Sequence, residues 1–139
     1  MKVVLDTNVI VSGVLTAQGV CAQILDMLTE GVFGIYVDDR ILEEYDGVLR
    51  RPRLHLVLDD AAEMMEWIRS VAEPVGAVPL PAELPDPDDM PFLEVAASTG
   101  AILVTGNTRH YPKRSRSGVT VLRTLLCPAG MRTLVPRAP

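Results

Sequence analysis

The sequence has few of the features that mark membrane, disulfide-rich or zinc-binding proteins. No stretch approaches the roughly 18 continuous apolar residues that a membrane span needs. Asp6 also interrupts the N-terminal apolar segment where a signal peptide would continue. The only cysteines, Cys21 and Cys127, form no CxxC pair and have no nearby histidine at zinc-ligand spacing. We therefore expect a cytoplasmic protein with reduced thiols, no membrane contact, no disulfide framework and no zinc site.

Acidic residues are absent from the last part of the chain. All 18 acids lie at or before Glu94, so the net charge of −5 conceals a basic C-terminal end. The basic residues beyond Glu94 are Arg109, Lys113, Arg114, Arg116, Arg123, Arg132 and Arg137. They form either a solvated charged end or a surface that attracts a polyanion such as nucleic acid. The acid-rich part would repel that polyanion unless a cation lay between them.

The length of 139 residues, 48% of them hydrophobic, allows one compact core and leaves little room for two. We see no internal repeat and no domain linker. We therefore expect one domain over residues 1–125 and a C-terminal tail over residues 126–139. The apolar residues within 125–135 would pack on the core, or else serve a dimer or a partner.

Strand-like and helix-like apolar patterns alternate along the chain. Short apolar runs predict strands at 2–5, 33–37, 75–78, 101–105 and 119–122. Apolar residues at helical spacing predict helices over 20–28, from an Asp38 or Asp39 cap to near 51, over 59–72 and over 88–99. The alternation predicts an α/β fold with a central, mainly parallel sheet of four to five strands and helices on both faces. Such sheets gather their chemistry at the C-terminal ends of the strands.

Polar residues cluster where these strands end and where two helices expose polar positions. The clusters are Asp6-Thr7-Asn8, Glu44, Asp86 to Asp89, and Gly106-Asn107. Asp6 on its own could be only a helix cap or a turn former. Taken together, the acids of these clusters give more information about function than any one of them alone.

Glu44 differs from its neighbour Glu43 in its angle on the predicted helix. At 100° per residue, Glu43 points nearly opposite the apolar stripe, whereas Glu44 lies on its border beside Ile41 and Val48. We expect Glu43 to be solvated and Glu44 to reach inward, with an ordinary boundary glutamate as the alternative. Asp46 lies on the opposite border of the stripe.

Asp89 lies on the buried face of its predicted helix. It precedes Phe92, Leu93 and Ala96 by three, four and seven residues, so it shares a face with these apolar groups. The alternative is a first-turn carboxylate that satisfies the helix dipole, a role that Asp86 or Asp88 could fill instead.

Carboxylates gathered at one sheet edge would repel one another and raise their pKa values unless a cation neutralised them. A ligand set of oxygens without histidine or cysteine favours magnesium or manganese over zinc. Such a site is suited to metal-assisted hydrolysis of a phosphodiester.

Three segments in order carry a family resemblance: VVLDTNVIVSG, ILEEYDGVLRRPR, and LPDPDDMPFLEVAASTGAILVTGNTRHYP. The sequence resembles the PIN-domain (PilT N-terminus) nucleases over roughly residues 2–125, and within them the toxins related to VapC. The resemblance implies that Asp6, Glu44 and Asp89 form a catalytic, metal-holding acidic core. Asn8 and Thr105 match supporting polar positions, and Asp86 matches a frequently acidic one. Many PIN nucleases have a fourth acid where this chain has Asn107, so a two-metal mechanism is in doubt.

The resemblance further implies a magnesium-dependent endoribonuclease, with manganese as a possible substitute ion, that acts as the toxin of a bacterial type II toxin–antitoxin pair. Its partners would be an RNA substrate, a cognate antitoxin and a second copy in a homodimer. The candidate phosphate contacts are Arg109, His110, Lys113, Arg114 and Arg116; His110 could instead be merely exposed.

Three other functions are alternatives to the active nuclease. A catalytically weak PIN domain that binds RNA or protein is the main alternative, and Asn107 motivates it. A haloacid-dehalogenase-type phosphatase would need a second aspartate where this chain has Asn8. A receiver domain would need a phosphoacceptor aspartate after a later strand and a partner lysine, and neither can be placed.

Overall fold

A parallel sheet forms the centre of the structure, a computed structural model that describes residues 1–55 and 58–124. Its strands are β1 (Lys2–Leu5), β2 (Gly34–Val37), β3 (Ala72–Pro74), β4 (Ile102–Thr105) and β5 (Val121–Arg123). The helices of the described ranges are α1 (Thr7–Leu15), α2 (Val20–Thr29), α3 (Asp39–Leu49), α4 (Leu58–Val71) and α5 (Met90–Thr99). Single 3-10 turns are η1 (Pro52–Leu54), η2 (Pro87–Asp89), η3 (Thr108–His110) and η4 (Lys113–Ser115).

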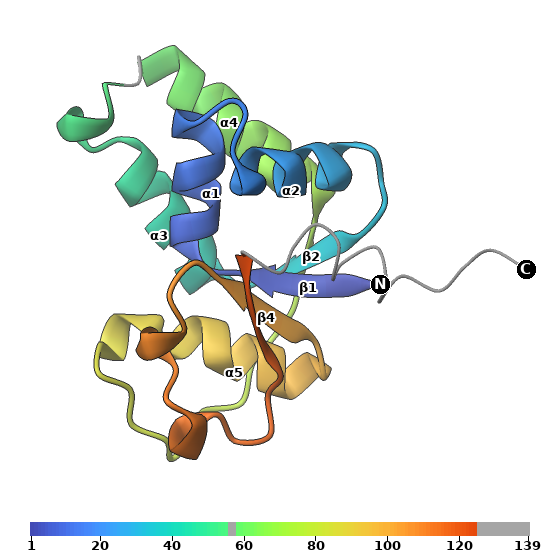
Figure 1. Ribbon diagram of the computed structural model, residues 1–139, viewed down its shortest axis with the longest axis vertical. Coiled ribbons are helices and arrows are strands. Elements are labelled where there is room, and N and C mark those ends of the chain that lie inside the picture. Colours follow the sequence, from blue (N-terminus) through green and yellow to red (C-terminus); the bar gives the residue numbers. More distant parts are fainter. Residues whose placement is uncertain (56–57, 125–139) are drawn as a thin grey trace, which may run out of the picture.

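The strand order is β3-β2-β1-β4-β5, and every neighbouring pair is parallel. The chain first moves outward from β1 to β3 and then returns across the sheet to β4. Because crossovers between parallel strands are right-handed, this reversal puts α5 on the face opposite the earlier helices. Figure 1 shows α1, α2 and α4 on one side of the sheet and α5 on the other. The predicted α/β fold with helices on both faces is confirmed.

The reversal also fixes where polar residues meet. β1 and β4 are neighbours, but the chain leaves their C-terminal ends in opposite directions, toward α1 and toward η3. Ligands of open parallel sheets bind at such a switch point. The backbone N–H of Asp6 donates to the Val104 carbonyl at 2.9 Å, so the two strand ends lie in register.

The hydrophobic core explains why the central strands form. Val3, Val4 and Leu5 of β1 are fully buried, as expected for a strand covered on both faces. Leu103 and Val104 of β4 are equally buried beside them. Tyr45 of α3 is also buried, and its hydroxyl donates to the carbonyl of Leu5. α3 is thereby attached to the end of β1.

Two elements differ from the sequence-based predictions. Helix α1 was not predicted; a Cβ on its Gly13 would lie 2.5 Å from Leu25 Cδ1, so glycine permits close packing of α1 on α2. The third strand was predicted at 75–78, which was wrong, because β3 spans Ala72–Pro74. β3 is a short edge strand with two exposed residues, so it carries little apolar signal.

The remaining predictions concern membranes and the C-terminal end. Within the described ranges, no single helix is long and apolar enough to cross a membrane; α1 and α2 meet those criteria only together, as a pair bent by 100°. Cys21 is a free thiol. The predicted tail, residues 126–139, lies outside the described residues, as do Cys127 and the apolar residues 125–135.

Candidate metal centre

Asp6 is the first residue after β1 and is only 3% exposed. Although it occupies the N-cap position of α1, its side chain makes no capping hydrogen bond. Its Oδ2 instead accepts hydrogen bonds from Thr105 Oγ1 at 2.9 Å and from the Tyr111 hydroxyl at 3.0 Å. The capping interpretation of Asp6 therefore does not apply, and the carboxylate is held at the end of the sheet.

Asn8 and Thr105 surround Asp6, as the resemblance implied. Asn8 Nδ2 lies 3.4 Å from both Asp6 Oδ2 and Thr105 Oγ1, which are long donor–acceptor distances. Its Oδ1 accepts a stronger bond, at 2.9 Å, from the Gly106 N–H. Asn8 thus connects the segment after β1 to the segment after β4.

Tyr111 is a site residue that sequence reasoning missed. It is fully buried, and its hydroxyl is one of the two close donors to Asp6. Arg116 Nε donates to the Tyr111 carbonyl at 2.8 Å, so this predicted phosphate contact supports the loop. The sequence signal for Tyr111 is weak, because this residue is a single aromatic in a basic loop that has neither strand nor helix periodicity.

Asp89 ends the η2 turn before α5 and is 6% exposed. Its side chain makes no capping hydrogen bond. Asp86 fills the capping role, because its Oδ1 accepts from the Asp88 N–H at 2.9 Å. The expectation that Asp89 faces inward while a neighbouring acid satisfies the backbone is confirmed.

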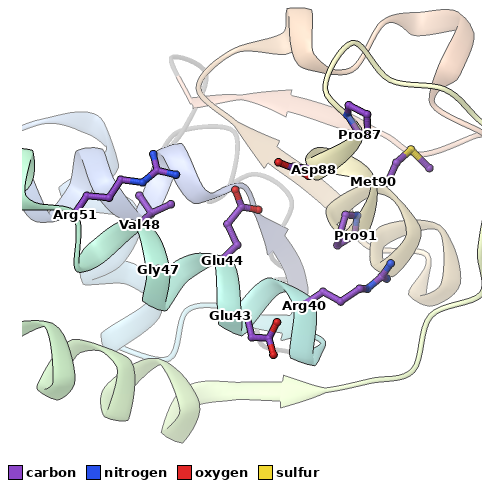
Figure 2. Close-up of a pocket in the computed structure, with 10 residues that line it drawn as sticks. All are labelled: Arg40, Glu43, Glu44, Gly47, Val48, Arg51, Pro87, Asp88, Met90 and Pro91. Atoms are coloured by element: carbon purple, nitrogen blue, oxygen red, sulfur yellow. The ribbon is translucent and has the colours of Figure 1, made fainter.

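Glu44 is half-buried on α3, whereas Glu43 is exposed, as the helical angles predicted. The N-terminus of α3 is fixed by Asp38, whose Oδ1 accepts from the Ile41 N–H at 3.0 Å. Figure 2 shows Glu44 extending from α3 toward Asp88, while Glu43 points away from it. Glu44 lines a cavity of about 390 Å³ together with Asp6, Asp86, Asp89 and His110.

The acids of this cavity disfavour one another's ionisation. Burial, and then the charges of Asp6 and Asp89, raise the pKa of Glu44 to about 7. Burial and the charge of Asp6 raise the pKa of Asp89 to about 6, against the opposing effect of His110. Burial also raises the pKa of Asp6, although its bonds from Thr105 and Tyr111 act in the other direction. A bound cation would relieve this repulsion.

Three ligand atoms converge within the cavity. One carboxylate oxygen each from Asp6 and Asp89, and one ring nitrogen of His110, all lie within 4.8 Å of one another. Asp89 Oδ2 and His110 Nδ1 lie 3.4 Å apart, and each is buried without a hydrogen-bond partner. Buried polar atoms that lack partners are costly, so this group fits a divalent cation. Glu44 lines the same cavity but is not in this compact group.

Asn107 and most of the predicted basic contacts lie outside the cavity lining. Asn107 is exposed, and its Oδ1 accepts from the Arg109 N–H at 3.1 Å, so its side chain supports the η3 turn. Arg109, Lys113 and Arg114 are exposed. Neither they nor Arg116 line the acidic cavity or the groove beside it.

The groove beside the cavity, about 520 Å³ in volume, runs between α3 and the start of α5 (Figure 2). It shares four lining residues with the acidic cavity: Glu44, Val48, Arg51 and Asp88. Arg51 lines both spaces and Arg53 lines the cavity. Among the side chains that the structure describes, no ion pair engages Arg51 or Arg53. Arg40, at another part of the groove, is instead paired with Asp38 and Glu94.

Comparisons with known proteins bear on the fold and the family of this chain. "Uncharacterized protein MJ1680" of Methanocaldococcus jannaschii is 30% identical over 111 residues, which cover 77% of this chain and 71% of that protein. The solved structure of VapBC2 from Rickettsia felis, bound to a DNA fragment from their promoter, superposes with a TM-score of 0.61. The match covers 88% of this chain and 98% of that chain at 15% identity, so it supports the fold alone. The PIN domain family model matches residues 2–109, and the chain therefore belongs to the PIN-domain family.

Proposed function

We propose that this protein is a metal-dependent endoribonuclease of the VapC-like toxin type. The observation that carries the proposal is the pair of buried carboxylates, Asp6 and Asp89, at the switch point of the sheet. Membership of the PIN-domain family supports nuclease activity. RNA as the substrate follows from the resemblance to the VapC-related toxins.

Asp6 and Asp89 would hold the cation, and Glu44 would contribute a further carboxylate from the lining of the same cavity. When bound, magnesium or manganese would polarise the scissile phosphate, lower the pKa of the attacking water and neutralise charge on the leaving oxygen. Thr105 and Tyr111 hold Asp6 through Oδ2, and Oδ1 receives neither of these bonds. These residues thus preserve the position of the carboxylate while its charge remains available.

The RNA strand would follow the groove along α3. Arg51 and Arg53 form no ion pair with any acidic side chain that the structure describes, and both line the acidic cavity. Arginine binds phosphate through its planar fork of N–H groups, and such contacts position a strand without reading its sequence. Arg109, His110, Lys113, Arg114 and Arg116 remain candidates for contacts with phosphates farther along the strand.

A protein partner and a cytoplasmic location belong to the same proposal. The fold similarity to VapBC2 of Rickettsia felis supports a cognate antitoxin. A homodimer is the remaining proposed assembly. Co-expression with the product of a neighbouring short reading frame, followed by size-exclusion chromatography with light scattering, would measure both assemblies.

The second candidate function is a PIN domain that binds RNA without cleaving it. Asn107 favours this candidate, because its side-chain oxygen supports the η3 turn at a position where a fourth acid is common in the family. Incubation of the purified protein with pooled cellular RNA in magnesium, manganese or a chelator should distinguish the nuclease from the binding module. We expect discrete, metal-dependent cleavage; RNA binding by folded protein without cleavage under any of these conditions would favour the binding module.

A further inference from the structure

We propose that His110 contributes a nitrogen ligand to the metal centre, so that the site selects manganese over magnesium. This inference rests on the proposed function, since it describes the same centre. The ring nitrogen of His110 lies with carboxylate oxygens of Asp6 and Asp89 in one group of ligand atoms, all within 4.8 Å of one another. Sequence spacing suggested only oxygen ligands and left His110 as a phosphate contact or an exposed loop residue.

The backbone after β4 delivers His110 to the acids. The Asn107 N–H donates to Thr105 Oγ1 at 3.1 Å, and the His110 N–H donates to the Asn107 carbonyl at 3.2 Å. Thr105 Oγ1 in turn donates to Asp6. The next residue, Tyr111, is anchored through its hydroxyl to the same carboxylate. His110 thus lies in the chain between Thr105 and Tyr111, and the side chains of both these residues donate hydrogen bonds to Asp6.

The environment of the imidazole indicates a ligand rather than a solvated side chain. The His110 side chain is 41% exposed, yet Nδ1 is buried and has no hydrogen-bond partner. The atom that faces it at 3.4 Å, Asp89 Oδ2, also lacks a partner and belongs to a side chain that is 9% exposed. A simple ion pair would explain the distance between them. It would not explain why neither atom adopts hydrogen-bonding geometry or why Asp6 lies within the same group.

The ligand chemistry determines which ion benefits. Magnesium prefers oxygen ligands and keeps several waters, so an imidazole adds little to its binding. Transition metals accept imidazole nitrogen readily, and manganese accepts carboxylates as well. Two carboxylates with one imidazole therefore favour manganese over magnesium more strongly than three carboxylates would.

Pulsed electron paramagnetic resonance on the Mn²⁺-loaded protein tests the nitrogen directly, because it detects ¹⁴N bound to manganese. We expect ¹⁴N modulation in the wild type and its loss in His110→Gln. Isothermal titration should show that His110→Gln weakens Mn²⁺ binding by about tenfold or more, with a much smaller effect on Mg²⁺. His110→Asp should bring the two affinities closer together, because it replaces nitrogen with oxygen.

His55→Asn is the matched control, since it removes the other histidine. His55 is exposed beyond η1 with a φ of 54°, a left-handed conformation that asparagine tolerates. The His55→Asn variant should retain both the ¹⁴N modulation and the Mn²⁺ affinity of the wild type. Absence of ¹⁴N modulation in the wild type, or unchanged Mn²⁺ affinity in His110→Gln, would overturn the inference. RNA cleavage in that case would leave the proposed function standing, whereas a wild type that binds no divalent ion would contradict both.

Discussion

At the scale of single residues, the inward-facing acids and the supporting Asn8 and Thr105 were predicted, whereas Tyr111 and the position of His110 were not. Asp89 and Glu44 could be placed because helical periodicity relates a polar residue to apolar neighbours in the same helix. Tyr111 and His110 reach the same cavity from a loop after β4, where no periodicity exists. Their position depends on the pairing of β1 with β4, which is a long-range contact. Local patterns carry no information about it.

The raised pKa values predict how the metal-free protein responds to pH. A carboxyl group whose pKa is raised by folding stabilises the native state below its unfolded pKa, and that contribution is lost as pH rises. For Glu44 this window runs from about 4.5 to about 7. We therefore expect the free energy of unfolding to fall as pH rises through this range, in urea titrations with a chelator present. Glu44→Gln should flatten the profile.

Glu43→Gln is the control for this pH experiment. Glu43 lies next to Glu44 on α3 but is exposed and points away from it (Figure 2). Its substitution should leave the pH profile unchanged. A Glu44→Gln profile as steep as that of the wild type would contradict the electrostatic description of the cavity.

At the scale of secondary-structure elements, buried and periodic segments were predicted well. Residues 7–15 were missed as a helix because they include Gly13 and several β-branched residues, which have low helix propensity. The helix is stabilised instead by packing on α2, α3 and β4. Edge strand β3 was misplaced because it contributes few buried side chains. Tertiary contacts therefore determine both the formation of α1 and the position of β3.

The loop between β3 and α5 depends on Glu94 of α5. This carboxylate is 6% exposed and accepts bonds from Arg40 Nη1 and from the Leu80 N–H, both at 2.7 Å. Glu94→Ala would leave the Leu80 N–H without its carboxylate partner and would leave Arg40 with Asp38 as its remaining partner. We expect destabilisation of about 1–3 kcal/mol in urea unfolding. Glu83→Ala, at an exposed residue of the same loop, should change stability by less than about 0.5 kcal/mol. Equal effects of the two substitutions would contradict this role of Glu94.

The residues that follow α3 are predicted to bind the RNA strand. Arg51→Ala, in an Asp89→Asn background that prevents cleavage, should weaken binding of a single-stranded RNA. Loss of one phosphate contact should reduce the slope of log affinity against log salt by about 0.7. Fluorescence anisotropy at several salt concentrations measures this slope.

Arg50→Ala is the matched control for this binding experiment. Arg50 precedes Arg51 but is paired with Asp46 at 2.7 Å and lines neither the cavity nor the groove. Its substitution should leave the salt slope unchanged. If Arg50→Ala and Arg51→Ala weaken binding equally, the strand does not follow the groove.

At the scale of the whole molecule, the charge distribution and the topology together explain the site. The chain reverses direction between β3 and β4, and this reversal brings Asp6, at the N-terminal end of the sequence, beside residues of the basic C-terminal part. In the proposed function, an RNA strand would meet the acids and their cation beside Arg51 and Arg53, which line the same cavity. The fold class was predictable from the alternation of strands and helices, because that pattern is distributed over the whole chain.

Metal-dependent cleavage by the acidic centre is tested by comparing RNA cleavage by the wild type, Asp89→Asn and Glu43→Gln in magnesium, in manganese and in a chelator. We expect the wild type and Glu43→Gln to cleave only with metal. Asp89→Asn should be inactive but folded, with metal-free stability equal to or above that of the wild type, because substitution removes repulsion among the acids. Wild-type activity in purified Asp89→Asn, or cleavage that persists in the chelator, would contradict a metal-dependent nuclease centred on Asp6 and Asp89.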